Sequence, residues 1–298
     1  SKCSPFSRTW NRILTTMKTL YSIAELRETL GAERRAGKKI GFVPTMGNLH
    51  TGHIQLIHQS NNNADITVAS IFVNPLHFGE NEDLDAYPRT LATDQEKLEA
   101  ANCDYLFAPN SNEMYPNGQV IQTLIEVPGI SDIHCGASRP GHFRGVATVV
   151  CKLFGIVQPD VAIFGEKDFQ QLMVIRRMTE DLFLPVEVLG APIARAQSGL
   201  ALSSRNGYLS EEELATAPTL NSTICQTIAQ INSGRRDYTV MQEEAQQILE
   251  QNGFKRDYYT ICNRKDLQPA DPEDTQLVLV AAAYLGKARL IDNMVIDL

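Results

Sequence analysis

The chain has 298 residues, of which 43% are apolar and 21% are charged. At about 150 residues per domain this length favours two domains. The apolar fraction is enough for a hydrophobic core, which excludes a disordered chain and a disulfide-stapled miniprotein. The net charge of −8 argues against a dedicated nucleic-acid binder but permits a local basic pocket for an anionic small molecule. No apolar run of about 18 residues occurs, so we expect no contact with a membrane.

The cysteines and the N-terminus indicate where the protein works. The six cysteines are widely spaced, and none forms a C-x-x-C pair. This spacing favours buried, reduced thiols in a cytoplasmic protein over a zinc site or a redox dithiol. Residues 1–16 contain basic residues, no acidic residue and no apolar core of signal-peptide length. We expect them to be a non-functional N-terminal extension, with a transit peptide as the alternative, and Met17 to begin the functional chain.

Strands and helices alternate through the first two-thirds of the chain. Apolar runs predict strands at 39–44, 65–73, 104–108, 160–164 and 184–189. Amphipathic segments predict helices at 22–30, 52–61, 90–101, 145–158 and 168–182. Buried strands separated by helices are typical of a parallel sheet covered on both faces, in which ligands bind at the carboxyl ends of the strands.

The pattern changes after residue 191. Two helices are expected at 211–231 and 240–251, and they are followed by strands at 257–262, 276–284 and 289–296. Such an order is typical of a smaller α+β domain. We therefore expect one domain over residues 17–191 and a second over 192–298.

The first candidate site lies between the strand 39–44 and the helix that follows it. The chain has no G-x-G-x-x-G fingerprint, so a nucleotide would have to bind in another way. Gly47 and Gly52 let a ligand approach the backbone, and a helix N-terminus attracts phosphate. His50 and His53 stand three residues apart, so both imidazoles can point at one anion. A single histidine is usually structural, but H-x-G-H at a strand-to-helix turn indicates function.

The second candidate site, Gly165 to Gln171, also joins a strand to a helix. Lys167 can pair with phosphate oxygens. Asp168 can hold Mg²⁺ or can simply cap the helix, and the sequence leaves both interpretations open. Gln170 and Gln171 point in different directions on a helix, so we expect at most one of them to face the pocket.

The third candidate site is a loop at the expected domain junction. Ser203, Ser204 and Arg205 follow a glycine-containing stretch and can close over a triphosphate. Taken alone, the segment is better explained as a capped turn before the next helix. The three sites together are hard to explain as structure alone.

The motifs PTMGNLHTGH, SIFVNP, DAYPRT, SRPGHFRGVATVV, FGEKDFQQL and GLALSSRNGYLS lie between residues 44 and 210. On these motifs the chain resembles the pantothenate synthetases (pantoate–β-alanine ligases), members of the nucleotidylyltransferase superfamily, from residue 17 to 298. The resemblance implies that ATP and pantoate form pantoyl adenylate and pyrophosphate, after which β-alanine displaces AMP to give pantothenate. It also implies Mg²⁺ with ATP, a Rossmann-like domain, a smaller C-terminal lid domain and a homodimer.

The resemblance further implies roles for individual residues. His53 takes the position of a proton donor, which we interpret as electrostatic stabilisation by a cation, with His50 and Lys167 as its catalytic partners. The implied ATP contacts are Met46, Gly47, Asn48, Leu49, His50, Thr51, Gly52, His53, Gly165, Glu166, Lys167, Asp168, Ala194, Leu202, Ser203, Ser204 and Arg205. Gln171 and Asn74 are implied at the pantoate and β-alanine site, and Asp94 is implied near the metal.

Position 77 departs from the family, which usually has a pantoate-binding glutamine there. Imidazole also donates and accepts one hydrogen bond, but with a different reach. We expect His77 still to line the pantoate pocket, after the strand 65–73. Beside a bound carboxylate it should keep its proton to higher pH, so pantoate affinity should weaken as the pH rises through neutrality.

Two other functions are compatible with parts of the sequence. A phosphopantetheine or nicotinate-nucleotide adenylyltransferase would need a further basic pocket for its phosphate acceptor, whereas Asn74 and Gln171 suit a small polyol acid. A catalytically degenerate nucleotide-binding protein would be expected to lose site residues. The chain retains His50, His53, Lys167, Ser203, Ser204 and Arg205.

Overall fold

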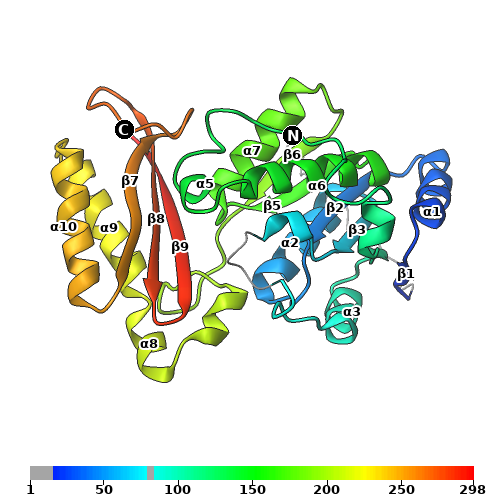
Figure 1. The fold of residues 1–298 in the computed structure, drawn as a ribbon, viewed down its shortest axis with the longest axis horizontal. Helices are drawn as coiled ribbons and strands as arrows, with labels where there is room; N and C mark the ends of the chain where they lie inside the picture. The colour runs from blue at the N-terminus through cyan, green and yellow to red at the C-terminus, as the bar shows by residue number, and fades with distance from the viewer. Residues whose placement is uncertain (1–15, 79–83) are drawn as a thin grey trace, which may run out of the picture.

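The computed structural model describes residues 16–78 and 84–298. Two sheets, each with its own helices, lie side by side (Figure 1). Residues 1–15, and with them Cys3 and almost all of the expected N-terminal extension, lie outside the described residues.

The first sheet has six strands in the order β1-β4-β3-β2-β5-β6, and every printed pairing is parallel. Its strands are β1 (Lys18–Leu20), β2 (Ile40–Thr45), β3 (Ile66–Ile71), β4 (Tyr105–Phe107), β5 (Val161–Gly165) and β6 (Glu187–Ala191). The chain winds outward in one direction from β2 to β4 and in the other from β5 to β6. The crevice at the carboxyl ends of β2 and β5 is therefore the place where this fold binds ligands.

Helices cover both faces of the parallel sheet because its strands are apolar on both sides. Phe42 faces the layer of α1 (Ile23–Arg35), α6 (His142–Val157) and α7 (Phe169–Asp181), whereas Val43 faces α2 (Thr51–Asn63) and α3 (Leu91–Ala100). Both side chains are fully buried. The remaining short helices are η1 (Pro75–His77), α4 (Ser111–Met114) and α5 (Cys135–Ser138). This is the doubly wound α/β core expected from the sequence.

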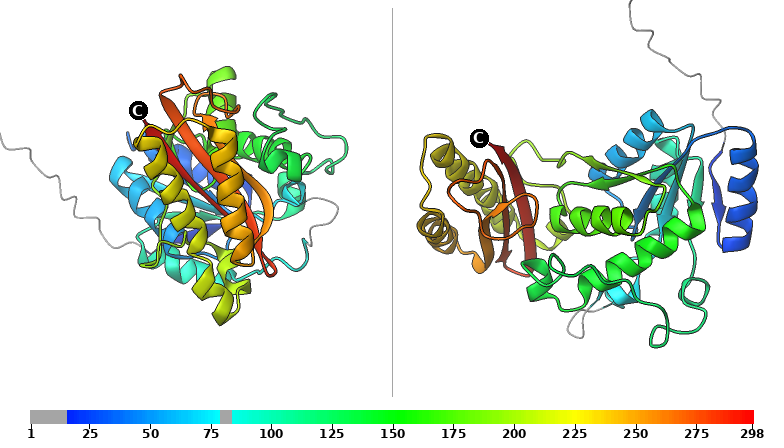
Figure 2. Two further views of the ribbon diagram at one scale, coloured as in Figure 1. Left: turned by 90° about the vertical axis from the view of Figure 1, so that its left-hand side faces the viewer. Right: turned by 90° about the horizontal axis from the view of Figure 1, so that it is seen from above.

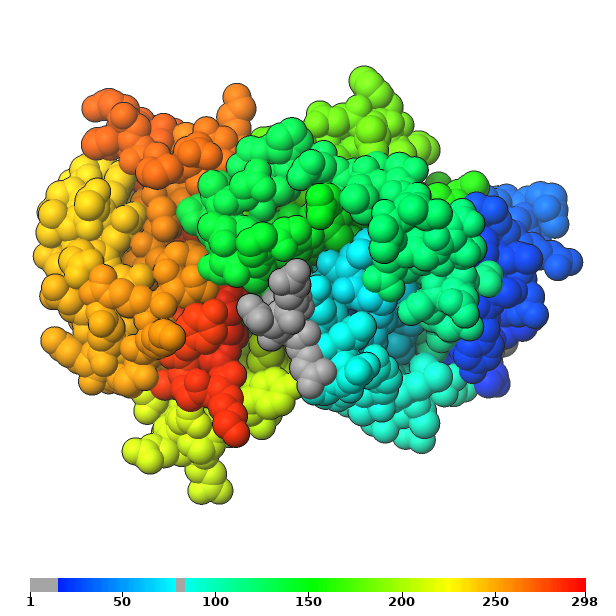
Figure 3. All heavy atoms as spheres, viewed as in Figure 1, coloured from blue at the N-terminus to red at the C-terminus, as the bar shows by residue number. Residues whose placement is uncertain are grey.

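The second sheet is antiparallel, in the order β7-β8-β9. Its elements are η2 (Ser204–Tyr208), α8 (Glu211–Thr216), α9 (Thr219–Asn232), α10 (Tyr238–Gln251), β7 (Lys255–Asn263), β8 (Gln276–Leu285) and β9 (Ala288–Asp297). Helices α9 and α10 pack on its outer face, and its other face is turned toward the parallel-sheet domain (Figure 2). The two domains are in contact in the space-filling view (Figure 3).

Three features of the fold differ from the sequence prediction or extend it. The single helix expected at 211–231 is wrong, because the chain forms α8 and α9 with Pro218 between them. Proline has no N–H to continue the first helix, but it is tolerated at the start of the second. Strand β1 was not predicted, since three residues are too few to show a pattern. Among the described residues, no helix combines the length and apolar character needed to cross a bilayer.

Candidate active site

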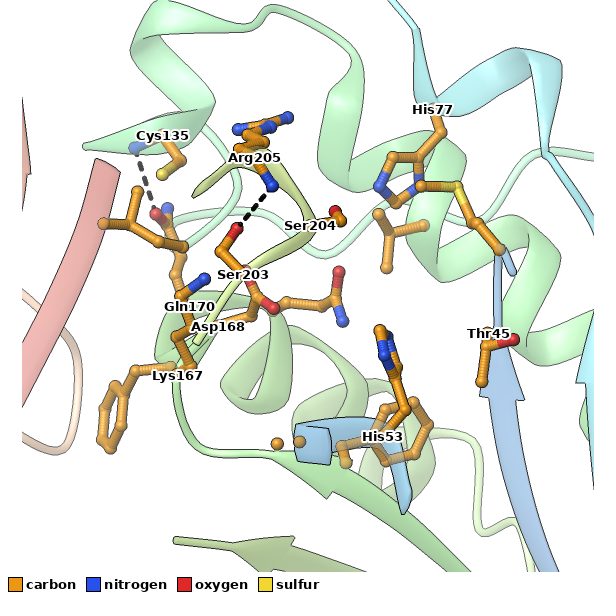
Figure 4. Close-up of a pocket in the computed structure, with 18 of the residues that line it drawn as sticks. Thr45, His53, His77, Cys135, Lys167, Asp168, Gln170, Ser203, Ser204 and Arg205 are labelled. Atoms are coloured by element: carbon orange, nitrogen blue, oxygen red, sulfur yellow. Dashed lines mark hydrogen bonds between the residues drawn. The ribbon is translucent and has the colours of Figure 1, made fainter. Parts of the chain in front are cut away.

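A cavity of about 340 Å³ lies at the carboxyl ends of β2 and β5 and is closed on one side by the C-terminal domain. This volume is in the range of small-molecule sites. His53 and His77 enter it from the parallel-sheet domain, and the segment Ser203 to Arg205 approaches from the domain junction (Figure 4). All three clusters predicted from the sequence therefore contribute to one cavity.

The two histidines form the start of α2. The backbone N–H of Gly52 donates to His50 Nδ1 at 3.0 Å, and the backbone N–H of His50 donates to His53 Nδ1 at 3.1 Å. This is a reciprocal capping box built from imidazoles. A Cβ on Gly52 would lie 2.7 Å from His50 Cε1, so only glycine leaves room for the ring. Because both Nδ1 atoms accept, the proton of each neutral ring is on Nε2.

The pKa values of these rings differ from the expectation that His53 acts as a cation. Burial, followed by the charges of His50 and Lys167, lowers the pKa of His53 to about 3. Burial and the charge of Lys167 also lower the pKa of His50. His53 is thus neutral at pH 7 in the free protein. It offers an oriented Nε2–H donor rather than a positive charge.

Asp94 organises the loop between β2 and α2. Its carboxylate accepts from the backbone N–H groups of Asn48 and Leu49, each at 2.9 Å, and from Thr90 Oγ1 at 3.0 Å. Gly47, at φ +81°, would place a Cβ 3.0 Å from this carboxylate. The side chain is only 2% exposed and does not line the cavity. Its oxygens are occupied by protein donors, an arrangement that differs from the metal contact implied by the resemblance.

The loop after β5 carries the second cluster. Lys167 and Asp168 both border the cavity. Burial lowers the pKa of Lys167, while the carboxylates of Asp168 and Asp292 oppose that shift. Asp168 stands at the N-cap position of α7 without making a side-chain capping bond. Its exposed carboxylate is therefore available to the cavity, which favours the magnesium interpretation over the helix cap.

The described residues contain no group of three or more His, Cys, Asp or Glu side chains that could hold a metal on their own. Mg²⁺ seldom needs such a group, since it often binds through one or two carboxylates together with substrate phosphates and water. A triphosphate beside Asp168 would fit that requirement.

Both glutamines of α7 border the cavity, so the expectation that at most one would face it is wrong. The Gln170 amide nevertheless makes its hydrogen bonds within the protein. It donates to the carbonyls of Ile130 at 2.8 Å and Ile133 at 2.6 Å, and it accepts from Cys135 N at 3.1 Å. Gln171, which is half-buried, is the one left to meet a substrate.

Asn74 has a similar internal role at the end of β3. Its Oδ1 accepts from Tyr115 OH at 2.6 Å and Leu76 N at 3.3 Å, and its Nδ2 donates to Gly145 O at 3.3 Å. The side chain is 1% exposed but still borders the cavity. These contacts fix the turn that presents His77.

His77 lines the cavity as expected, but its surroundings are cationic. Its ring centroid lies 4.3 Å from that of His142, and its carbonyl accepts from His142 Nδ1 at 3.0 Å and Arg139 Nη2 at 3.3 Å. Burial, followed by the charges of His142 and Arg139, lowers the pKa of His77 well below its ordinary value. In the free protein these surroundings therefore oppose the protonated His77 that the sequence leads us to expect beside bound pantoate.

The third cluster is a turn, as the sequence also allowed. Ser203 caps η2 by accepting from Arg205 N at 3.1 Å. Leu202 N donates to Ala194 O at 2.8 Å, which brings the two predicted ATP contacts together. All five residues of this group line the cavity: Ala194, Leu202, Ser203, Ser204 and Arg205.

Of the remaining predicted ATP contacts, Met46, His50, Gly52, His53, Gly165, Lys167 and Asp168 border the cavity. Gly47, Asn48, Leu49, Thr51 and Glu166 are not among its lining residues. Leu49 is 3% exposed and packs in the core beside α3.

Sequence reasoning missed several residues that come from loops, from the starts of α5 and α6 and from the second sheet. The cavity is also lined by Tyr87, Cys135, Arg139, His142, Tyr258, Arg289, Asp292 and Asn293. One pattern could have indicated two of them. Asp292 and Asn293 are adjacent polar residues between apolar pairs of the last strand, which breaks the period-two alternation.

The comparisons with known proteins agree on one family. The model of the family described as pantoate-beta-alanine ligase matches residues 18–295. The chain is 57% identical over 282 residues to the pantothenate synthetase of Stutzerimonas stutzeri (strain A1501), covering 95% of this chain and 99% of that protein. It is 55% identical over 278 residues to that of Marinobacter nauticus, covering 93% and 99%.

Solved structures extend this likeness to the fold. The crystal structure of pantothenate synthetase from Thermus thermophilus superposes with a TM-score of 0.87 at 44% identity, covering 93% of this chain and 99% of that one. A crystal structure of the pantoate-beta-alanine ligase from Francisella tularensis, complexed with beta-gamma ATP and beta-alanine, gives a TM-score of 0.79 at 35% identity over 93% and 97%.

Proposed function

The chain belongs to the pantoate-beta-alanine ligase family, and from this premise we infer what its cavity does. It ligates pantoate and β-alanine in two steps. A pantoate carboxylate oxygen attacks the α-phosphorus of ATP, which forms pantoyl adenylate and expels pyrophosphate. The β-alanine amine then attacks the acyl carbon, forms the amide of pantothenate and expels AMP. The observation that supports this most strongly is the meeting of all three sequence clusters in one cavity at the β2–β5 crevice.

The first step needs stabilisation of charge on the phosphates. We propose that the Nε2–H groups of His50 and His53 donate to oxygens of the reacting α-phosphate, since the capping box fixes both rings before ATP binds. Fixed donors of this kind do not have to reorganise during the reaction. Lys167 and Arg205 supply positive charge for the β- and γ-phosphates and for the departing pyrophosphate.

His77 and Gln171 give the cavity two hydrogen-bonding side chains for the acyl substrate. We propose that pantoate lies between His77 and Gln171, with its hydroxyl groups and carboxylate hydrogen-bonded to these neutral side chains. A neutral imidazole donates once and accepts once, as a glutamine amide can, which allows His77 to replace the usual residue. The Asn74 amide supports this site through the turn that it fixes.

We propose that Mg²⁺ binds together with ATP and that the Asp168 carboxylate would bind the ion. When bound, the ion would neutralise charge on the triphosphate. The free carboxylate of Asp168 supports this assignment, whereas the internal bonds of Asp94 favour a role in shaping the loop.

Three further proposals concern the whole molecule. Residues 17–191 would bind ATP and pantoate, and residues 192–298 would act as the lid. A homodimer is proposed because the family resemblance implies one. The cytoplasmic location is supported by the five described cysteines, which are all free thiols.

A pyrophosphate-release assay separates the candidate functions. With ATP, Mg²⁺ and pantoate but no β-alanine, the ligase should release a burst of about one pyrophosphate per site, and β-alanine should convert the burst into turnover. An adenylyltransferase would release pyrophosphate only with a phosphorylated acceptor. A degenerate nucleotide-binding protein would bind ATP without releasing any.

A further inference from the structure

Asn293, on β9 of the second sheet, contacts the loop that carries Lys167. Its Nδ2 donates to Glu166 O at 2.9 Å and to Lys167 O at 2.8 Å. The side chain is 4% exposed, so water does not compete for these bonds. A residue of the C-terminal domain thus holds two consecutive carbonyl groups of the other domain, close to the phosphate end of the cavity.

The side chain at position 293 must be a hydrogen-bond donor to make this contact. Both partners are backbone carbonyl oxygens, so the amide must present its NH₂ group, and each of its two N–H bonds can meet one carbonyl. The same loop is held from its own sheet, where Glu166 N donates to Ala191 O at 2.8 Å. The loop that carries Lys167 is therefore held from both domains.

The preceding residue fixes the other phosphate-facing segment. Asp292 is 4% exposed and forms two bonds of 2.8 Å with Arg195, in the linker that follows β6. Arg195 also donates to Gly199 O at 3.0 Å, in the loop that leads to Ser203. Two adjacent residues of β9 thus hold both the Lys167 loop and the linker to the third cluster.

We propose that Asn293 is a positioning residue for Lys167, through which the C-terminal domain sets the place of the lysine ammonium against the ATP phosphates. The proposal rests on the proposed function of Lys167 in adenylation. Without the amide the loop can shift, and a misplacement of about 1 Å at a reacting centre can cost ~10²-fold in rate.

The test is a matched pair of Asn→Asp substitutions. Asn293→Asp keeps the size of the side chain but turns carboxylate oxygens toward two carbonyls. Asn252→Asp makes the same change in the same domain, at an exposed amide that donates to Ile248 O at 2.8 Å, away from the cavity. We expect single-turnover adenylation to fall ~10²-fold in Asn293→Asp and to stay at the wild-type rate in Asn252→Asp. The KM for pantoate should change little in both.

A double-mutant cycle with Lys167→Ala distinguishes positioning from a general effect on folding. If Asn293 acts through Lys167, Asn293→Asp adds little to Lys167→Ala, whereas independent effects multiply. Multiplying effects, or an Asn293→Asp protein with the wild-type adenylation rate, would overturn the proposal. If Asn293→Asp does not fold, Asn293→Ala replaces it in the cycle, because it removes the donor without adding a charge.

The same cycle measured as calorimetric ATP affinity does not depend on the acyl substrate. If Asn293→Asp lowers the affinity for ATP in the wild-type background but not in the Lys167→Ala background, the positioning role is supported. Undiminished binding in Asn293→Asp argues against it. Failure of the wild-type protein to release pyrophosphate from ATP and pantoate would instead contradict the proposed function.

Discussion

The two ring nitrogens of His53 have different functions, and substitutions can remove one function while keeping the other. Nδ1 accepts the backbone N–H of His50 at 3.1 Å and helps to cap α2, which leaves Nε2–H for the phosphate. Asparagine places its amide near the position of Nδ1, and glutamine reaches toward that of Nε2. We expect His53→Asn to keep the cap and lose adenylation, and His53→Gln to retain more of the rate.

The two effects also differ in size. Loss of one preorganised donor to developing charge costs roughly 10²- to 10³-fold in rate, or about 3–4 kcal/mol in activation free energy. Loss of a helix cap costs about 1 kcal/mol of folding stability, which is small beside the roughly 5–15 kcal/mol typical of folded proteins. A large loss of activity in His53→Ala would therefore not come from unfolding.

The pH dependence tests the charge of the ring. Because burial and neighbouring charges hold the pKa of His53 at about 3, its protonation should not change between about pH 6 and 9. The folded pKa lies below the unfolded value of about 6.5, so the stability contributed by this neutral ring is complete above about pH 6.5 and is lost as the pH falls toward 3. The adenylation rate should show no step near 6.5 that depends on His53.

The test of the Nε2–H donor is a rapid-quench measurement of pantoyl adenylate formation in four proteins: wild type, His53→Asn, His53→Gln and His53→Ala. Urea unfolding of the same proteins is the control for loss of the helix cap. Near-wild-type adenylate formation by His53→Asn would refute the role of Nε2–H. A step near pH 6.5 that is present in wild type and absent in His53→Asn would show that the ring acts as a cation.

Four further predictions follow from the same geometry. Lys167→Ala should lower single-turnover adenylation by ~10²-fold and leave the reaction of preformed adenylate with β-alanine unchanged; a slower amine step alone would contradict this assignment. His77→Gln and wild type should give parallel profiles of pantoate KM from about pH 6 to 9, because burial, His142 and Arg139 keep the pKa of His77 well below 6.5; diverging profiles would show that it titrates. Asp168→Asn should raise the Mg²⁺ concentration needed for half-maximal rate without changing the melting temperature, since its side chain makes no capping bond; a lowered melting temperature would favour the cap. Asp94→Ala should destabilise the protein by about 2–6 kcal/mol, because it leaves two backbone N–H groups without their acceptor at ~1–3 kcal/mol each; an unchanged urea midpoint would refute this.

The sequence predicts most of the parallel-sheet domain because its central strands are unbroken apolar runs. The predicted ranges agree to within two residues at each end with three central strands: β2, β3 and β5. Each of these strands is buried on both faces. The edge strand β1 has three residues and no such pattern. The break between α8 and α9 depends on Pro218, which a hydrophobic period alone does not reveal.

The same logic explains which site features were predictable. Motifs placed directly after β2 and β5 must meet, because neighbouring parallel strands end at the same edge. The neutral state of His77 was not predictable, since it depends on His142 and Arg139, which are more than 60 residues away in the chain. Asn293 was missed for a similar reason: its partners Glu166 and Lys167 belong to the other domain, at a separation of 126–127 residues.

One measurement tests the central claim, that this cavity activates pantoate by adenylation, most directly. Pantoate labelled with oxygen-18 in its carboxylate is converted to pantothenate by the wild-type protein, and the AMP is analysed by mass spectrometry. The carboxylate oxygen that attacks the α-phosphorus remains with the phosphate when the amine expels AMP. The account predicts one labelled oxygen in each AMP formed, whereas unlabelled AMP, or label in pyrophosphate or inorganic phosphate, would contradict it.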